Sequence, residues 1–117
     1  MRNINIGGKE YKVVASPITL FLYKKEFKSD LLGDLISLRE IESDPSTFDG
    51  MLVLQFAWAM IKTGKLGAAF PGFEQWLKEL EYVDFEDTEM MLNVMEEAQA
   101  GFFRGGKQTQ TEAENSK

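Results

Sequence analysis

Residues Met51 to Ile61 are apolar except at Gln55, and this run limits the possible folds more than any other part of the sequence. A helix of this composition carries apolar side chains all round, so protein must surround it. The run is too short to cross a bilayer, which needs about 20 residues. It therefore predicts a buried central helix over residues 47–63, ended by Gly64.

Near the N-terminus, apolar and polar residues alternate on both sides of Gly7-Gly8. Alternation across a Gly-Gly pair is typical of a β-hairpin, because glycine accepts the positive φ angles of a tight turn. We expect strands near residues 3–6 and 9–14. A lone hairpin is only marginally stable, so it should pack on helices.

Four further helices are expected from apolar spacing and from cap residues. Ser16-Pro17 suits the start of the first of them, because serine favours the N-cap and proline the first turn. The expected helices cover residues 17–28, 30–42, 72–82 and 87–103. Residues 104–117 have no large apolar side chain and should form a disordered polar tail. The prediction is one α+β, mostly α domain over residues 1–103, with a hairpin packed on four to five helices.

Histidine and cysteine are both absent, which removes the commonest general base, the thiol nucleophile and the commonest zinc ligands. The acidic cluster at Asp84, Glu86, Asp87 and Glu89 lacks the ligand spacing and the glycine of a calcium loop, so we interpret it as a helix N-terminus. We expect no catalytic residue, no metal and no cofactor. The chain should be a binding protein and not an enzyme.

Charge is distributed unevenly along the chain, whose net charge is −6. Residues 1–30 hold six Lys or Arg against three Asp or Glu, whereas residues 31–100 hold four against fourteen. A body this acidic is a poor partner for nucleic acid, and no segment predicts a membrane span or a signal peptide. The asymmetry is explained either by a solvated surface or by head-to-tail self-association of a basic end with an acidic face.

Aromatic and methionine side chains supply the candidate interaction residues. Phe70, Phe73 and Trp76 flank a Pro-Gly loop, and Met91, Met95 and Phe102 form a stripe on the last helix. Methionine adapts to varied apolar partners. The alternative for all six residues is packing in the core.

The layout of these segments resembles the tail assembly chaperones of long-tailed phages and prophages of Gram-positive bacteria. The resemblance covers about residues 3–103. It is carried by the hairpin Ile4–Tyr11, the helix start Ser16-Pro17, the Trp-bearing helix Phe56–Gly64, the segment Phe73–Leu77 and an acidic Met-rich last helix. It rests on layout and short phrases, so it transfers no individual functional residue.

The resemblance implies a chaperone that binds the tape measure protein and promotes assembly of the tail tube around it. It further implies the host bacterial cytoplasm as location, absence from the mature virion, oligomerisation, and contact with the major tail protein as a possible addition. Members of the family are often made in two forms through a ribosomal frameshift, and Gly106-Lys107 could be encoded at such a point. The alternative function is another small adaptor, a different phage morphogenesis factor or a regulatory protein.

Overall fold

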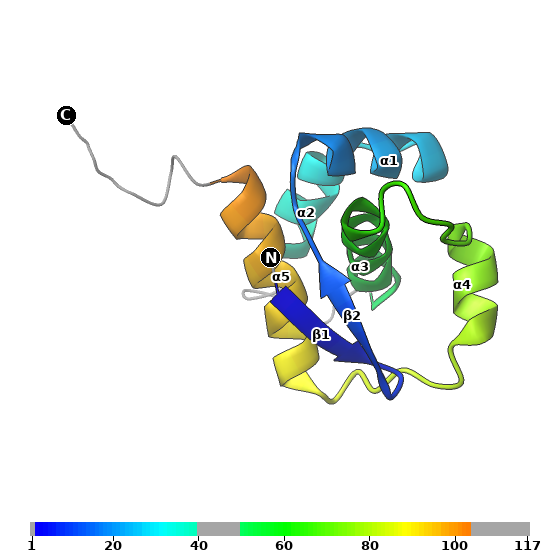
Figure 1. The fold of residues 1–117 in the computed structure, drawn as a ribbon. Helices are drawn as coiled ribbons and strands as arrows, with labels where there is room; N and C mark the ends of the chain where they lie inside the picture. The colour runs from blue at the N-terminus through cyan, green and yellow to red at the C-terminus, as the bar shows by residue number, and fades with distance from the viewer. Residues whose placement is uncertain (1, 40–49, 104–117) are drawn as a thin grey trace.

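The computed structural model describes residues 2–39 and 50–103. A two-stranded hairpin leads into five helices, and this confirms the α+β, mostly α class predicted from the sequence (Figure 1). The elements are β1 (Arg2–Ile6), β2 (Lys9–Val13), α1 (Pro17–Phe27), α2 (Leu31–Arg39), α3 (Gly50–Gly64), α4 (Phe73–Glu79) and α5 (Thr88–Phe102).

Helix α3 is the centre of the fold. Every residue from Phe56 to Ile61 is buried, and so are Val53, Leu54 and Thr63. Helices α1, α2 and α5 and strand β2 all pack against α3, which lies in the middle of Figure 1. The buried central helix predicted from the apolar run is therefore present. The first residues of the predicted range, 47–49, lie outside the described residues.

The hairpin turns at Gly7 and Gly8, whose φ angles are +63° and +84°. Both angles lie in the left-handed region, which glycine enters without steric cost, so the Gly-Gly pair determines the turn. Strand register pairs Ile4 with Tyr11 and Arg2 with Val13. One face of the hairpin, which carries Ile4, Ile6 and Val13, is buried.

Helix α1 begins and ends as local capping rules require. Ser16 is the N-cap, and its backbone N–H donates a hydrogen bond to Thr19 Oγ1 at 3.1 Å. The helix ends because Lys28 adopts the left-handed conformation (φ 57°), from which its N–H bonds to the Lys24 carbonyl. Thr19 Oγ1 also lies 2.6 Å from Thr63 Oγ1, and this buried hydroxyl pair joins α1 to the end of α3.

The segment between α4 and α5 differs from the sequence expectation. Helix α4 ends at Glu79 and not near residue 82, because Leu80 is extended (φ −79°, ψ 125°). The chain then runs past the hairpin turn, where a Cβ atom on Gly7 would lie 2.6 Å from the Tyr82 carbonyl oxygen. Helix α5 follows, and the Asp87 side chain caps it by accepting a hydrogen bond from the Met90 N–H at 3.2 Å. The predicted polar tail, residues 104–117, and residues 40–42 of the predicted second helix lie outside the described residues.

Candidate interaction surfaces

Two of the candidate aromatic residues, Phe73 and Trp76, lie in the core. Their side chains are 9% and 1% exposed. The Phe73 ring meets Phe27 edge-on at 4.8 Å between centroids, and the Trp76 ring meets Tyr11 edge-on at 5.9 Å. A partner cannot reach the Trp76 ring while α4 stays in place.

These rings belong to a larger group, here termed the aromatic cluster. Neighbouring rings in this group have centroids 4.7–6.4 Å apart, in the tilted and edge-on arrangements that aromatic pairs prefer. The cluster joins α1, α3 and α4. Its members are Tyr23, Phe27, Phe56, Trp58, Phe73 and Trp76.

Two polar contacts hold α4 and the preceding loop against the cluster. Glu26 Oε2 accepts the backbone N–H of Phe73 at 2.8 Å, so a side chain of α1 caps the start of α4. Trp58 Nε1 donates to the Pro71 carbonyl oxygen at 3.1 Å. The candidate Phe70 precedes this loop and is half-buried, with its ring 6.5 Å from that of Trp76.

The other three candidates lie on α5. Met91, Met95 and Phe102 are half-buried and pack against the core. Beside the two methionines, Leu92 is 58% exposed. We define the α5 stripe as Met91, Leu92 and Met95, which lie together on the helix surface because of their spacing.

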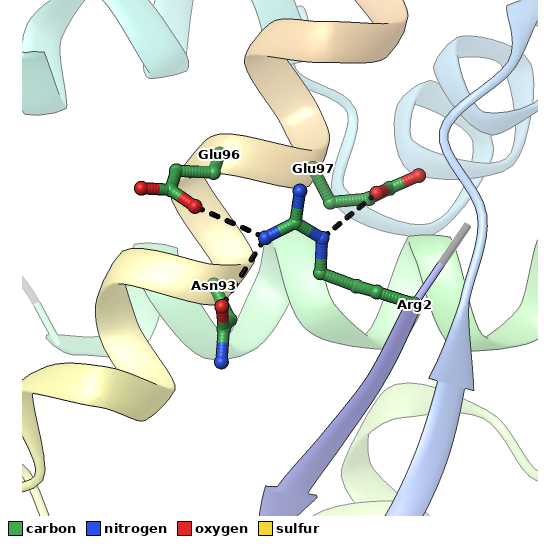
Figure 2. Close-up of polar contacts among 4 residues, drawn as sticks. All are labelled: Arg2, Asn93, Glu96 and Glu97. Atoms are coloured by element: carbon green, nitrogen blue, oxygen red, sulfur yellow. Dashed lines mark hydrogen bonds and ion pairs between the residues drawn. The ribbon is translucent and has the colours of Figure 1, made fainter.

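Helix α5 is also tied to the hairpin by a polar group that we term the polar joint: Arg2, Asn93, Glu96 and Glu97. Figure 2 shows the Arg2 guanidinium reaching from β1 to three side chains of α5. Arg2 Nε lies 3.1 Å from Glu97 Oε1, and Arg2 Nη1 lies 3.1 Å from Glu96 Oε1. Arg2 Nη1 also donates to Asn93 Oδ1 at 3.2 Å.

The two carboxylates of the polar joint differ in their surroundings. The side chain of Glu96 is 62% exposed, whereas that of Glu97 is 6% exposed. Burial raises the pKa of Glu97. Cationic groups and hydrogen bonds, among them those from Arg2 and from the backbone of Ala15, lower that pKa by more, so it lies below its ordinary value. Glu97 is therefore a buried carboxylate that is held ionised.

The sequence carried a partial signal for the polar joint. Arg2 precedes Ile4 and Ile6 at a spacing of two, so strand alternation places it on the buried face of the hairpin. A cation on that face requires a carboxylate partner. Nothing in the local sequence says that α5 supplies it, because the two segments lie more than 90 residues apart.

A second polar group joins α1, α2 and α3. The buried Tyr23 hydroxyl donates to Asp34 Oδ2 at 2.7 Å and lies 2.8 Å from Gln55 Oε1. Ser29 Oγ donates to the same Asp34 oxygen at 2.8 Å. The Asp34 carboxylate therefore accepts hydrogen bonds from α1 and from the turn that follows it. These bonds fix the position of α2 relative to α1.

Helix α1 presents an apolar surface that the candidate set missed. Ile18 is 38% exposed and Phe21 is 59% exposed, and with half-buried Leu22 and exposed Lys25 they share one side of the helix. We term these four residues the α1 face. The sequence did contain a signal for this surface. Apolar residues are spread widely around the helix, and because only one side can pack on α3, some of them must be exposed.

The chain between α4 and α5 forms an acidic surface, here termed the acidic linker (residues 81–87). Its Glu81, Asp84 and Glu86 side chains are exposed, and its Tyr82 is 58% exposed. Asp84 Oδ1 accepts the Glu86 N–H at 2.9 Å, which orders the turn before α5.

Across residues 2–39 and 50–103, no group of three or more His, Cys, Asp or Glu side chains is arranged to hold a metal ion. In the same part of the chain, no helix has the length and apolar character needed to span a membrane. Comparisons with protein-family models, curated proteins and solved structures find no match to this chain.

Proposed function

We propose that this chain is a non-catalytic tail assembly chaperone that binds a phage tape measure protein in the host bacterial cytoplasm and promotes tail tube assembly. The proposal combines the resemblance in sequence layout with one structural observation, the α5 stripe. The major tail protein, which must polymerise around the same client, is a second candidate partner.

The α5 stripe supports binding of a helical client. Leu92 is largely exposed, and the half-buried Met91 and Met95 lie beside it. Methionine side chains adjust to different apolar shapes, so a methionine surface suits a long client whose sequence varies along its length. An amphipathic client helix would lay its apolar side along the stripe.

Acidic groups beside the stripe favour particular clients. Glu89 is exposed on α5 one turn before Leu92, and Glu96, whose exposed carboxylate also pairs with Arg2, lies one turn after it. They would attract client helices that carry lysine or arginine next to their apolar positions, and they would repel acidic ones. The proposal therefore specifies a basic amphipathic helix as the bound unit.

The test is co-expression with a helical fragment of the tape measure protein encoded beside this chain's gene. The wild-type chain should keep the fragment soluble and co-purify with it. The substitution Leu92→Glu should reduce the co-purified amount by about tenfold, because it places a charge in the centre of the apolar contact.

Leu66→Glu is the matched control. Leu66 is 60% exposed, close to the exposure of Leu92, but it lies in the loop after α3. This variant should capture the fragment as the wild type does, and circular dichroism should show both variants folded. Failure of the folded wild type to bind would favour a different small adaptor or regulatory protein, and equal loss in both variants would remove the stripe from the proposal.

A further inference from the structure

Helix α4 lies apart from the other helices. In Figure 1 it stands at the right of the molecule between two loops, whereas α1, α2 and α5 pack directly on α3. Its seven residues, Phe73–Glu79, are too few for a helix that is stable alone. Its position therefore depends on side chains that join it to other elements.

The attachment of α4 combines two buried rings with two polar contacts. Phe73 and Trp76 lie three residues apart on one side of the helix and belong to the aromatic cluster. The Glu26 carboxylate accepts the Phe73 N–H, and the Trp58 indole donates to the Pro71 carbonyl oxygen. The outward side of α4 carries exposed polar residues: Glu74, Gln75, Lys78 and Glu79.

One polar atom beneath α4 is left without a hydrogen bond. The Trp76 side chain is 1% exposed, and no protein group accepts a hydrogen bond from its Nε1. Across residues 2–39 and 50–103, it is the one buried side-chain nitrogen or oxygen atom for which the structure shows no such partner. A buried donor of this kind destabilises the closed arrangement, and it gains hydrogen bonds to water when α4 moves away. The closed position of α4 is therefore one from which opening is favoured by a specific atom.

We propose that α4 is a lid, which opens as a unit while the other elements stay folded and uncovers a binding site for a helix of a partner protein. Opening frees the Glu26 carboxylate and the Trp58 indole N–H on the body of the protein. It also uncovers the rings of Phe27 and Tyr11, which contact the rings of α4 in the closed form. The site is an apolar surface with one hydrogen-bond acceptor and one donor at its edge.

The contacts of α4 specify the occupant, because a partner helix must replace what α4 supplies. It needs two large apolar side chains three residues apart, as Phe73 and Trp76 are. Its first turn must offer a free N–H to Glu26, and the chain just before that turn must offer a carbonyl oxygen to Trp58. The partner is therefore the N-terminal part of a helix that carries an aromatic or large aliphatic pair at this spacing.

This inference goes beyond the proposed client contact. The site uses α1, α3 and β2, and it shares no residue with the α5 stripe. Opening and binding are both measured on the full chain, with a short peptide as the probe and no tape measure protein present. Failure of either proposal therefore leaves the other untouched.

Opening is tested by hydrogen exchange of backbone amides, followed by NMR at several low urea concentrations. The amides of Trp76 and Leu80, which donate to carbonyl groups of this segment, should exchange at least about a hundredfold faster than those in the middle of α3. Their exchange should depend little on urea, because a local opening exposes little surface. Equal rates and equal urea dependence in the two helices would mean that α4 opens only by global unfolding, and would overturn the proposal.

Two changes should shift the opening in opposite directions. Glu26→Gln replaces a carboxylate by a neutral amide at the Phe73 N–H, and should speed exchange in α4 by about threefold. Replacement of Trp76 by 3-benzothienylalanine, which has sulfur in place of the indole N–H at nearly the same shape, should slow exchange by about fivefold. Exchange as fast as in the wild type after this replacement would show that the unpaired N–H does not favour opening, and would contradict the lid.

Binding is tested with a fluorescent peptide that has the sequence of residues 70–80, because it brings the same helix start and ring pair as α4. The full chain should bind it at least about tenfold more tightly than a peptide that carries Phe73→Ser and Trp76→Ser. In the chain itself, Leu77→Ser should strengthen binding by about tenfold, because half-buried Leu77 helps to keep the lid closed. Phe27→Ser should weaken binding by about tenfold, since it removes a ring from the site beneath.

Phe21→Ser is the matched control for Phe27→Ser. Phe21 lies on the same helix, but its ring is 59% exposed and lies outside the aromatic cluster, so peptide binding should stay at the wild-type level. Circular dichroism should show all variants folded. Loss of structure cannot produce opposite effects in Leu77→Ser and Phe27→Ser. Equal binding of the two peptides, weaker binding by Leu77→Ser, or equal loss in the two phenylalanine variants would each overturn the site beneath α4.

Discussion

Two regions of the molecule, the aromatic cluster and the polar joint, hold helices in place by different chemistry. The aromatic cluster fills space between α1, α3 and α4 with rings in tilted and edge-on contact. Towards α5, the polar joint depends on one guanidinium, one buried carboxylate and two distances of 3.1 Å. The cluster contributes large buried rings from three helices, whereas the polar joint links β1 to one particular face of α5. Buried ring volume therefore stabilises one region, whereas paired charges orient the helix in the other.

The largest expected effect is in the aromatic cluster. Trp58→Ala removes a side chain that is 2% exposed and that contacts the rings of Phe27 and Phe73. It should lower the free energy of unfolding by about 3–5 kcal/mol, measured by urea denaturation, because it leaves a cavity. Leu66→Ala, at an exposed apolar position, should change stability by less than about 0.5 kcal/mol. A loss below about 1 kcal/mol at Trp58 would mean that the rings collapse into the space.

In the polar joint, Glu97→Gln should cost about 2 kcal/mol, because it replaces a charge-assisted hydrogen bond to Arg2 by one to a neutral amide and puts an NH2 group in a buried site that accepts hydrogen bonds. Glu96→Gln should cost less than about 1 kcal/mol, since the Glu96 carboxylate is exposed and its ion pair is screened by water. Urea denaturation at neutral pH measures both. Equal costs would show that burial does not distinguish the two carboxylates.

The same substitution predicts a difference in pH dependence. The pKa of Glu97 is lower in the folded chain than its ordinary value of 4.5, so the unfolded chain takes up the proton more readily. The stabilisation is therefore fully present above that ordinary value and is lost as the pH falls through the folded pKa. Wild-type stability should fall over this acidic range, the fall should be smaller in Glu97→Gln, and Trp58→Phe should keep the wild-type slope. If stability depends on pH in Glu97→Gln as it does in the wild type, Glu97 does not contribute to the loss of stability in acid.

A smaller effect is expected where α5 passes the start of α1. A Cβ atom on Gly101 would clash with Ala15 Cβ and lie 2.7 Å from the Ala15 carbonyl oxygen. Gly101→Ala should therefore destabilise the chain by about 1–2 kcal/mol, although alanine is the better helix former. Gly33→Ala in α2 meets no atom closer than 3.8 Å and should stabilise by up to about 1 kcal/mol. Thermal or urea unfolding of the two variants measures both changes in stability, which should have opposite signs. A change of the same sign in both would contradict the close packing at Ala15.

The sequence predicted those parts of the fold that local chemistry determines. The Gly-Gly turn, the Ser16-Pro17 helix start and the apolar run of α3 each contain their own signal. The end of α4 was placed too late, because the apolar spacing continues through Leu80 while the backbone must leave the helix to pass Gly7. That constraint comes from a residue more than 70 positions away.

The candidate surfaces were harder to predict, because the type of an apolar residue does not determine whether its side chain is exposed. Trp76 and Leu92 are both large and apolar, yet one is 1% exposed and the other 58%. The difference depends on what packs over each helix. Charge was easier to place, since the basic start and the acidic middle of the sequence correspond to exposed lysines on α1 and exposed carboxylates in the acidic linker.

The close approach of Tyr82 to the hairpin turn has a practical consequence for labelling. A hairpin tip is usually a safe place for an inserted tag or a fluorophore, but here the backbone of another segment lies behind Gly7. The loop at Gly67 is different, because no atom lies within 4 Å of a Cβ placed there and its exposed neighbours face solvent. Gly67 itself has a φ of +90°, which side-chain-bearing residues adopt only with strain, so a probe belongs at its exposed neighbour Ala68, outside the α1 face, the α5 stripe and the acidic linker.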